Sequence, residues 1–457
     1  MNILLLFSDQ QHKYALGSVN PAFHTPCLDR LAAEGTLFLN GYSPNPVCGP
    51  FRGCLMTGQL TSHCRVYDNC WPLPENTPTM ASVLNEHGYE TSYVGKWHLG
   101  GNGAGPIPES LRGGFRHFIG YQCYNGFDPR PPFLNRVAFF DEENREHVYQ
   151  RHRTDVTTDL AVERLRQAAG SGKPFFLTVS YQAPHYPEQP SPEYAALYEN
   201  AEFPVTEDEE EVDPYTPTFS PYSPRPYDSC PDYQRYGGNM KEYKRLYAAM
   251  VSQVDAGVGR ILETLRETGH EKDTLVLYTS DHGDMQGSHG LKNKCYPHEK
   301  SAGVPFIARL PGGKPMRTSA LVSGVDIFPT VLEAAGIPRI QGLDGHSFLS
   351  FLRDGKEEPN AYILSEYVLH EAPWRMIRTP KWKLTVSLRE YLPMSLYDME
   401  EDPHEMHDLK EDPRFRDVIA GLTGILRENT CEIGDTRTSD EMRARWYPAR
   451  ASLDGNS

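Results

Sequence analysis

Short apolar runs alternate with helical patterns along residues 1–345 of this chain. The runs predict buried strands at residues 3–7, 90–94, 175–180, 275–279 and 305–308. Helices are predicted over residues 27–34, 80–87, 157–169 and 240–268, the last with apolar residues at a period close to 3.6. This order predicts an α/β fold with a large, mostly parallel sheet flanked by helices, whose active groups would lie at the carboxyl ends of the strands.

The pattern changes after about residue 345. Short strands are predicted at residues 362–367, 375–378 and 383–386, followed by Leu396-Tyr397-Asp398. We therefore expect a catalytic domain over residues 1–345 and a smaller C-terminal α+β subdomain over residues 346–457, built on an antiparallel sheet with a closing helix. Residues 187–238 are rich in Pro, Tyr and acidic residues and read as an irregular insertion, with the acidic run 207–211 as a solvated face.

Charge and cysteine content limit the possible partners. The net charge of −16 argues against a nucleic-acid-binding protein, because phosphate contacts need a concentrated basic face. Nine cysteines, an odd number in a long chain, favour reduced thiols over a disulfide framework. No apolar run is long enough for a membrane span or a signal segment, so we expect a cytoplasmic protein with no membrane partner.

Two predicted strands are followed by possible metal ligands. Asp9 and Gln10 follow the first strand, and Asp281 and His282 follow the fourth. Carboxyl ends of parallel strands share one edge of a sheet, so these side chains can converge. Carboxylate and amide oxygens are ligands that suit Ca²⁺ or Mg²⁺. Because an imidazole nitrogen is also present, Mn²⁺ stays a further candidate.

The segment Cys48-Gly49-Pro50-Phe51-Arg52 lies just past the first predicted strand and helix. Taken alone it could be a buried cysteine in a tight turn. Its Cys-x-Pro-x-Arg pattern, however, resembles the signature of the formylglycine-dependent sulfatases of the alkaline phosphatase superfamily. Further segments match that family in order and spacing, among them Gly95-Lys96-Trp97-His98, residues 181–187 and residues 287–294.

The resemblance implies an alkaline-phosphatase-like fold and the oxidation of Cys48 to formylglycine by a formylglycine-generating maturase. The hydrated aldehyde would carry one hydroxyl to attack sulfur and another to expel sulfate. Arg52 would hold this group, His98 would contact its hydroxyl, and His185 would face the leaving group. Lys96 and Lys294 would bind sulfate oxygens, while His289 would line the pocket or brace its loop. The metal, Ca²⁺ first, would bind Asp9, Gln10, the Cys48-derived oxygen, Asp281 and His282.

We therefore predict a sulfatase that hydrolyses a small anionic sulfate monoester, first a sulfated sugar and second an aryl or choline sulfate. The main alternative is a phosphonate monoester or phosphodiester hydrolase of the same superfamily. Gln10 and His282 favour that alternative, whereas Lys96 and His98 favour sulfate. A non-catalytic binding homologue is a third reading, and it is disfavoured because every chemical position is filled.

Overall fold

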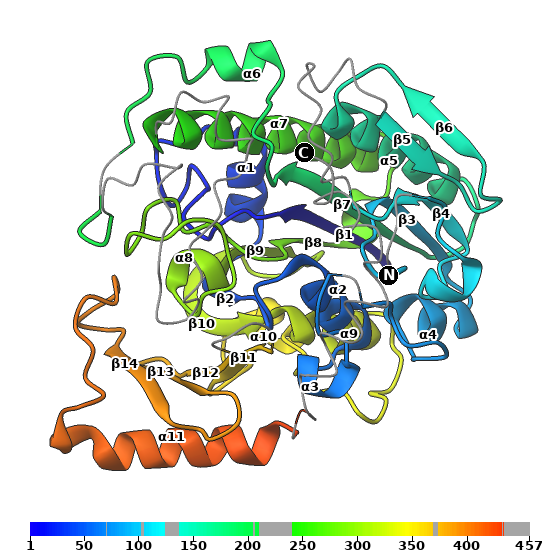
Figure 1. The fold of residues 1–457 in the computed structure, drawn as a ribbon. Helices are drawn as coiled ribbons and strands as arrows, with labels where there is room; N and C mark the ends of the chain where they lie inside the picture. The colour runs from blue at the N-terminus through cyan, green and yellow to red at the C-terminus, as the bar shows by residue number, and fades with distance from the viewer. Residues whose placement is uncertain are drawn as a thin grey trace, which may run out of the picture.

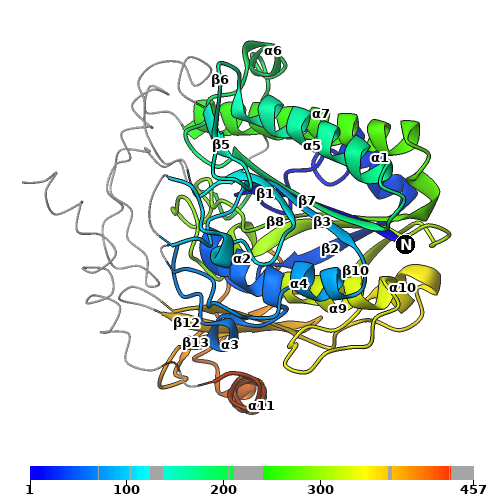
Figure 2. The same cartoon turned by 90° about the vertical axis from the view of Figure 1, so that its right-hand side faces the viewer.

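Figure 1 shows the chain as a computed structural model, which describes residues 1–69, 71–101, 105–123, 137–203, 206–209, 240–368, 373–431 and 433. A large sheet carries helices on both faces, and a small sheet lies beyond the helices of one face (Figure 2). The predicted α/β architecture is confirmed. None of the helices in the described part of the chain is long and apolar enough to cross a membrane.

The large sheet has ten strands. They are β1 (Asn2–Asp9), β2 (Thr36–Tyr42), β3 (Glu90–Lys96), β4 (His117–Tyr121), β5 (Val137–Phe140), β6 (Glu146–Tyr149), β7 (Phe175–Pro184), β8 (Thr274–Ser280), β9 (Gly303–Arg309) and β10 (Met316–Ser323). Their order is β10-β2-β9-β8-β1-β7-β3-β4-β5-β6. The strands β8, β1, β7, β3 and β4 are mutually parallel and form the centre of the sheet. Every residue of β1, β7 and β8 is buried, which explains their continuous apolar runs.

One of the predicted strands departs from the parallel pattern. Strand β9 pairs antiparallel with both β8 and β2. A parallel return would need a crossover that carries the chain back to the amino edge of the sheet. The connection from β8 to β9 contains only the four-residue helix α8 (Glu299–Ala302), so the chain turns back at the carboxyl edge instead.

Helices cover the two faces of the sheet as the alternation of side chains along β1 requires. Leu4 and Leu6 pack in one apolar cluster with α1 (Pro26–Glu34), α5 (Arg153–Ala169) and α7 (Met240–Glu267). Ile3, Leu5 and Phe7 point to the other face, which carries α2 (Cys48–Thr57), α4 (Met80–Glu86), α9 (Ile327–Ala334) and α10 (Leu349–Asp354). Figure 2 shows these two helix layers on opposite sides of the sheet. The shorter helices are α3 (Thr61–Cys64) and α6 (Pro192–Ala196), with 3-10 turns at Glu109–Leu111, Glu271–Asp273, Gly324–Asp326 and Pro413–Phe415.

The C-terminal sheet is antiparallel, as predicted. Its strands follow one another as β11 (Ile363–Tyr367), β12 (Trp374–Arg378), β13 (Trp382–Ser387) and β14 (Pro393–Asp398), and α11 (Arg416–Asn429) packs against β12 and β13. Lys383 of β13 joins the two parts of the molecule, because its Nζ lies 2.8 Å from Glu299 Oε1 of α8 and 2.8 Å from Glu405 Oε1. The boundary at residue 345 stays a prediction.

The acidic run of the insertion is only partly solvated where the structure describes it, since Glu207 is exposed but the two residues after it are not. Asp208 is buried and accepts a hydrogen bond from Ser288 Oγ. Glu209 Oε2 lies 2.5 Å from Lys244 Nζ of α7, and its Oε1 pairs with Lys300 of α8. The two lysines supply the counter-charges that allow these carboxylates to leave solvent. Residues 210–238 of the predicted insertion lie outside the described part.

Candidate active site

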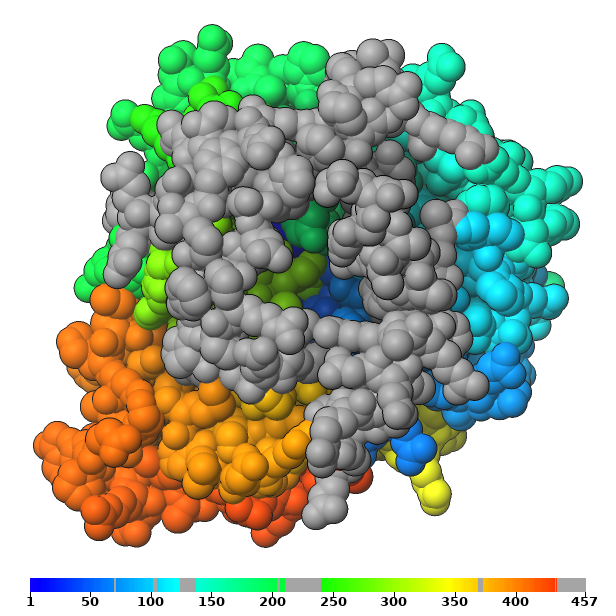
Figure 3. All heavy atoms as spheres, in the orientation of Figure 1, coloured from blue at the N-terminus to red at the C-terminus, as the bar shows by residue number. Residues whose placement is uncertain are grey.

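Four adjacent parallel strands bring the predicted side chains to one edge of the sheet. Lys96 ends β3, His185 follows β7, Asp9 ends β1, and Asp281 follows β8. The register places the strand ends side by side, since Ser8 pairs with Ser280 and Asp9 with Pro184. Figure 3 shows a hollow at the centre of the face presented in Figure 1, with atoms of the blue and green parts of the chain inside it.

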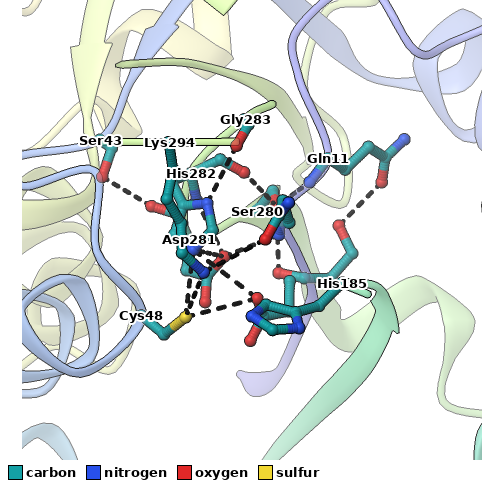
Figure 4. Close-up of polar contacts among 12 residues, drawn as sticks. Gln11, Ser43, Cys48, His185, Ser280, Asp281, His282, Gly283 and Lys294 are labelled. Atoms are coloured by element: carbon teal, nitrogen blue, oxygen red, sulfur yellow. Dashed lines mark hydrogen bonds and ion pairs between the residues drawn. The ribbon is translucent and has the colours of Figure 1, made fainter. Parts of the chain in front are cut away.

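Cys48 is the first residue of α2 and points into this group. Its Sγ lies 3.0 Å from Lys294 Nζ, 3.2 Å from His282 Nε2 and 3.6 Å from Asp9 Oδ1 (Figure 4). The side chain is buried, and the partial positive charge of the helix N-terminus favours a negative group at this position. Burial would lower the pKa of Lys294, but electrostatic interactions with Cys48 and Asp9 outweigh burial and raise this pKa, so the lysine stays charged. Lys294 is thus placed to hold an anion against Cys48.

The donor set fits a divalent cation. One ligand atom from each of Asp9, Cys48, Asp281 and His282 lies within 4.8 Å of the others, and all four residues are buried. His282 Nδ1 must donate its hydrogen to Gly283 O at 3.0 Å, because a carbonyl only accepts. Its Nε2 lone pair therefore faces Asp281 Oδ1 at 3.4 Å and Asp9 Oδ1 at 3.6 Å. Burial lowers the pKa of His282 to about 4, which keeps the imidazole neutral, as a metal ligand must be.

Gln10, the fifth predicted ligand, lies beside these four. Its backbone has a φ of 71° and its N donates to Asp281 Oδ1 at 2.9 Å. The side-chain Oε1 accepts from Lys294 Nζ at 3.2 Å, and Nε2 donates to Asp284 Oδ2 at 2.6 Å. The oxygen end of the amide is therefore on the side of Cys48.

Arg52 holds the two carboxylates of the site. Its Nη2 donates to Asp9 Oδ2 at 3.1 Å and to Asp281 Oδ2 at 3.2 Å. Its Nη1 donates to Lys96 O and to Ser180 Oγ, both at 2.6 Å, and the whole side chain is fully buried. The contacts of Arg52 run to Asp9, Asp281, Lys96 and Ser180, and its predicted role of holding the Cys48-derived group stays a prediction.

The two carboxylates differ in their ease of ionisation. Burial alone would raise the pKa of Asp9, but Lys96, whose Nζ donates to Asp9 Oδ2 at 2.6 Å, and the other cations of the site hold it well below its ordinary value. Burial and the negative charge of Asp9 raise the pKa of Asp281 to about 7. A pair of buried carboxylates in which one resists ionisation is stabilised by additional positive charge. This is the electrostatic requirement that a bound cation meets.

The backbone at His98 does not continue strand β3, as alternation along a strand assumed. Strand β3 ends at Lys96, and His98 has a φ of 59°, so the two residues do not share the face of a continuing strand. His98 is nevertheless buried, and burial together with the charges of Lys96 and Arg52 lowers its pKa well below the ordinary value. A neutral imidazole next to these cations can accept a proton.

His185 and His289 differ in how closely they relate to the site. His185 is buried, its Nδ1 donates to Tyr186 O at 2.8 Å, and burial with the charge of Lys294 lowers its pKa well below the ordinary value. The ring centroids of His289 and His298 lie 4.5 Å apart, and the backbone N of His289 donates to Asp208 O at 2.6 Å. Of the two roles predicted for His289, these contacts are those of a residue that braces the loop carrying Lys294.

Sequence reasoning missed three polar residues that support this edge. Ser180 of β7 accepts from Arg52, and Asp284 accepts from Gln10 and from Tyr243 of α7. Asp284 lies within the same five-residue segment as Asp281 and His282, which was the available signal. Ser180 reads only as the last residue of an apolar strand, and Tyr243 as a core position of a helix.

Comparison with known proteins gives consistent matches. The sulfatase family model matches residues 1–337, and a model described as N-sulphoglucosamine sulphohydrolase, C-terminal, matches residues 287–432. A choline-sulfatase from Rhizobium meliloti (strain 1021) is 33% identical over 491 residues, covering 99% of this chain and 92% of that protein.

Solved structures share the fold. The structure of a protein in complex with its substrate D-glucosamine-2-N,6-O-disulfate has a TM-score of 0.79 at 25% identity, over 93% of this chain and 97% of that one. The phosphonate monoester hydrolase of Agrobacterium radiobacter has a TM-score of 0.74 at 22% identity, over 93% and 95% of the two chains. At that identity the second likeness concerns the fold alone.

Proposed function

Because the chain belongs to the sulfatase family and is therefore a sulfuric ester hydrolase, we propose that it cleaves the sulfate monoester of a small sulfated sugar with a formylglycine made from Cys48. The observation that carries this proposal is the position of Cys48. Its Sγ is buried at a helix N-terminus, within 3.6 Å of a lysine, an imidazole and a carboxylate. A maturase that oxidises Cys48 is the partner this proposal requires.

Formylglycine supplies two hydroxyls on one carbon, so that one can attack sulfur and the other can later expel sulfate. Oxidation removes the large sulfur atom, and Lys294 Nζ, now 3.0 Å from Cys48 Sγ, is placed to bind an oxygen of the incoming sulfate. Lys96 Nζ lies 2.6 Å from Asp9 Oδ2 and supplies a second buried cation. These two charges offset the global net charge of −16 where the substrate anion must enter.

A divalent cation would be held by Asp9, Gln10, Cys48, Asp281 and His282, and we propose Ca²⁺ because oxygens dominate this set. When bound, it neutralises charge on sulfate and lowers the pKa of the attacking hydroxyl. Arg52 keeps Asp9 and Asp281 in place for this purpose.

Proton transfers fall to the remaining side chains. The leaving alcohol needs a proton, which Lys294 can donate as it stands. His185 is neutral with its ring hydrogen on Nδ1, so it can donate a proton only once a bound sulfate anion favours its protonated form. His98 accepts the proton of the second hydroxyl when sulfate departs, which is consistent with its neutral, buried imidazole. Asp281 is the alternative acceptor.

Two findings support a sugar as the alcohol. The C-terminal family model is described by a sulfated glucosamine, and the similar solved structure contains a glucosamine disulfate as its substrate. Choline sulfate is a second candidate, because the choline-sulfatase relative is 33% identical over nearly the whole chain. A phosphonate monoester is the third candidate substrate, because Gln10 and His282 favour a phosphonate monoester hydrolase.

The test is a comparison of kcat/KM for glucosamine 6-sulfate, glucosamine N-sulfate, choline sulfate, 4-nitrophenyl sulfate and a phenylphosphonate monoester. The protein is co-expressed with a maturase, and Cys48→Ala is the inactive control. We expect glucosamine 6-sulfate to be the best substrate, whereas preference for glucosamine N-sulfate, which is a sulfamate, would overturn the ester as the cleaved group. A higher kcat/KM for choline sulfate would mean that the substrate is choline sulfate and not a sulfated sugar. Preference for the phosphonate ester would overturn the proposal that the natural substrate is a sulfate ester. The cytoplasmic location stays a prediction, which fractionation of the native cells would test.

A further inference from the structure

Asp284 sits on the loop after β8 and is fully buried. Its carboxylate receives three donors. Oδ2 accepts from Gln10 Nε2 at 2.6 Å and from the Tyr243 hydroxyl, and Oδ1 accepts from the backbone N of Gln286 at 3.1 Å. Because each partner donates, Asp284 acts here only as an acceptor, and its two oxygens are held from three directions.

This acceptor decides which end of the Gln10 amide faces the site. The oxygen and nitrogen of a glutamine amide are nearly equal in size, so the hydrogen-bonding partners fix its orientation. Asp284 takes the Nε2 end, and Oε1 is left on the side of Lys294, whose Nζ is 3.2 Å away and itself 3.0 Å from Cys48 Sγ. A cation can bind the oxygen end of an amide but not its NH₂ group, so only this orientation makes Gln10 a ligand.

We propose that Asp284 is a positioning residue that turns the Gln10 amide with its oxygen toward the cation, and that the Tyr243 hydroxyl fixes Asp284 for this task. The inference rests on the cation site of the proposed function. It also explains why the chain can use an amide at position 10. An acidic side chain at that position would present a second carboxylate to Asp284, and the two would repel each other.

The experiment measures Ca²⁺, Mg²⁺ and Mn²⁺ affinity by titration calorimetry on metal-free protein, without any substrate. Asp284→Asn leaves one acceptor oxygen for three donors, so Gln10 Nε2 can lose its partner and the amide can reverse and lose its oxygen from the site. We expect the affinity for the ion that binds wild-type protein best to fall about 10- to 100-fold, the range for a lost partner of a metal ligand. Tyr243→Phe should cause a smaller loss of the same kind.

The decisive arm repeats Asp284→Asn in the Gln10→Asp background. There the asparagine removes a repulsive carboxylate and needs no particular amide orientation, so we expect the affinity to rise or stay unchanged. Asp255→Asn is the matched control, since Asp255 of α7 is a buried acceptor of the backbone N–H groups of Cys27 and Leu28 in α1. It should change thermal stability without changing metal affinity.

A loss of the same size in both backgrounds would mean that Asp284 only supports the fold, and it would overturn the inference. No loss in either background would overturn it too. If wild-type protein binds none of the three ions, the cation site of the proposed function fails together with this inference. If wild-type protein binds one of the ions tightly and Asp284→Asn changes the metal affinity equally in both backgrounds, the positioning role is refuted but the cation site is not.

Discussion

Replacing Arg52 by lysine tests how much of the site depends on a planar fork of donors rather than on a positive charge. Arg52 Nη2 contacts Asp9 Oδ2 and Asp281 Oδ2 at 3.1 and 3.2 Å, and Nη1 contacts two neutral acceptors at 2.6 Å. A single ammonium cannot reach both pairs. If it stays with the carboxylates, two bonds from the cation to neutral acceptors, worth about 1–3 kcal/mol each, are lost, and if it leaves them, two bonds to carboxylates, worth about 1.5–3 kcal/mol each, are lost.

We therefore expect Arg52→Lys to lower the free energy of unfolding by about 2–6 kcal/mol. If about 2.7 kcal/mol of that loss reflects misplaced carboxylates in the transition state, kcat/KM falls roughly a hundredfold. The assay pairs thermal denaturation with turnover of 4-nitrophenyl sulfate by matured protein.

Arg375→Lys is the matched control. Arg375 is also buried and its Nε donates to Glu366 Oε1 at 3.0 Å, but it lies on β12 of the C-terminal sheet. This variant should lose stability and keep kcat/KM. Arg52→Lys with both values unchanged would refute the reasoning, and a loss of stability alone, as in Arg375→Lys, would reduce Arg52 to a structural role.

Three further predictions concern other parts of the account. Removal of bound metal by a chelator should lower the melting temperature and abolish turnover, and Ca²⁺ at about 100 times its Kd should restore about 2.7 kcal/mol of stability; an unchanged melting temperature would contradict the cation site. His98→Ala should slow sulfate release more than alcohol release, giving a burst of alcohol that wild type lacks; equal slowing of both would remove His98 from the second step. The side-chain hydrogen bond with Asp344 raises the pKa of His63 to about 9 although burial opposes it. The folded pKa lies above the ordinary value, so this pair stabilises fully below about pH 6.5 and its contribution is lost as pH rises through about 9. The melting-temperature difference between wild type and His63→Gln should therefore shrink across that window, and a constant difference would contradict the pairing.

The sequence was sufficient to predict which strands are central and which edge carries the chemistry. Strands that are buried on both faces leave continuous apolar runs, and the polar residue that ends each run marks the carboxyl edge. This is why Asp9 and Asp281 could be assigned to one edge before the strand order was known, whereas Lys96 and His185 were assigned to the site through the resemblance to the sulfatases. The direction of strand β9 was predicted wrongly, because it depends on the connection before the strand and not on the residues of the strand itself.

Long-range partners explain the other differences. Asp208 and Glu209 read as solvent-exposed charges until Lys244 and Lys300 are seen to approach from α7 and α8. The place of His98 depends on a left-handed backbone that alternation along a strand does not foresee. The orientation of Gln10 depends on Asp284, 274 residues further along the chain. Such contacts are set by tertiary packing, which local patterns do not record.

The most direct test of the account is the mass of the tryptic peptide 31–52 from protein co-expressed with a formylglycine-generating maturase. The account predicts a peptide lighter than the cysteine form by the change from a thiol to an aldehyde at Cys48, together with sulfatase activity that rises with the converted fraction. A peptide that keeps its cysteine in protein with full sulfatase activity would contradict the account.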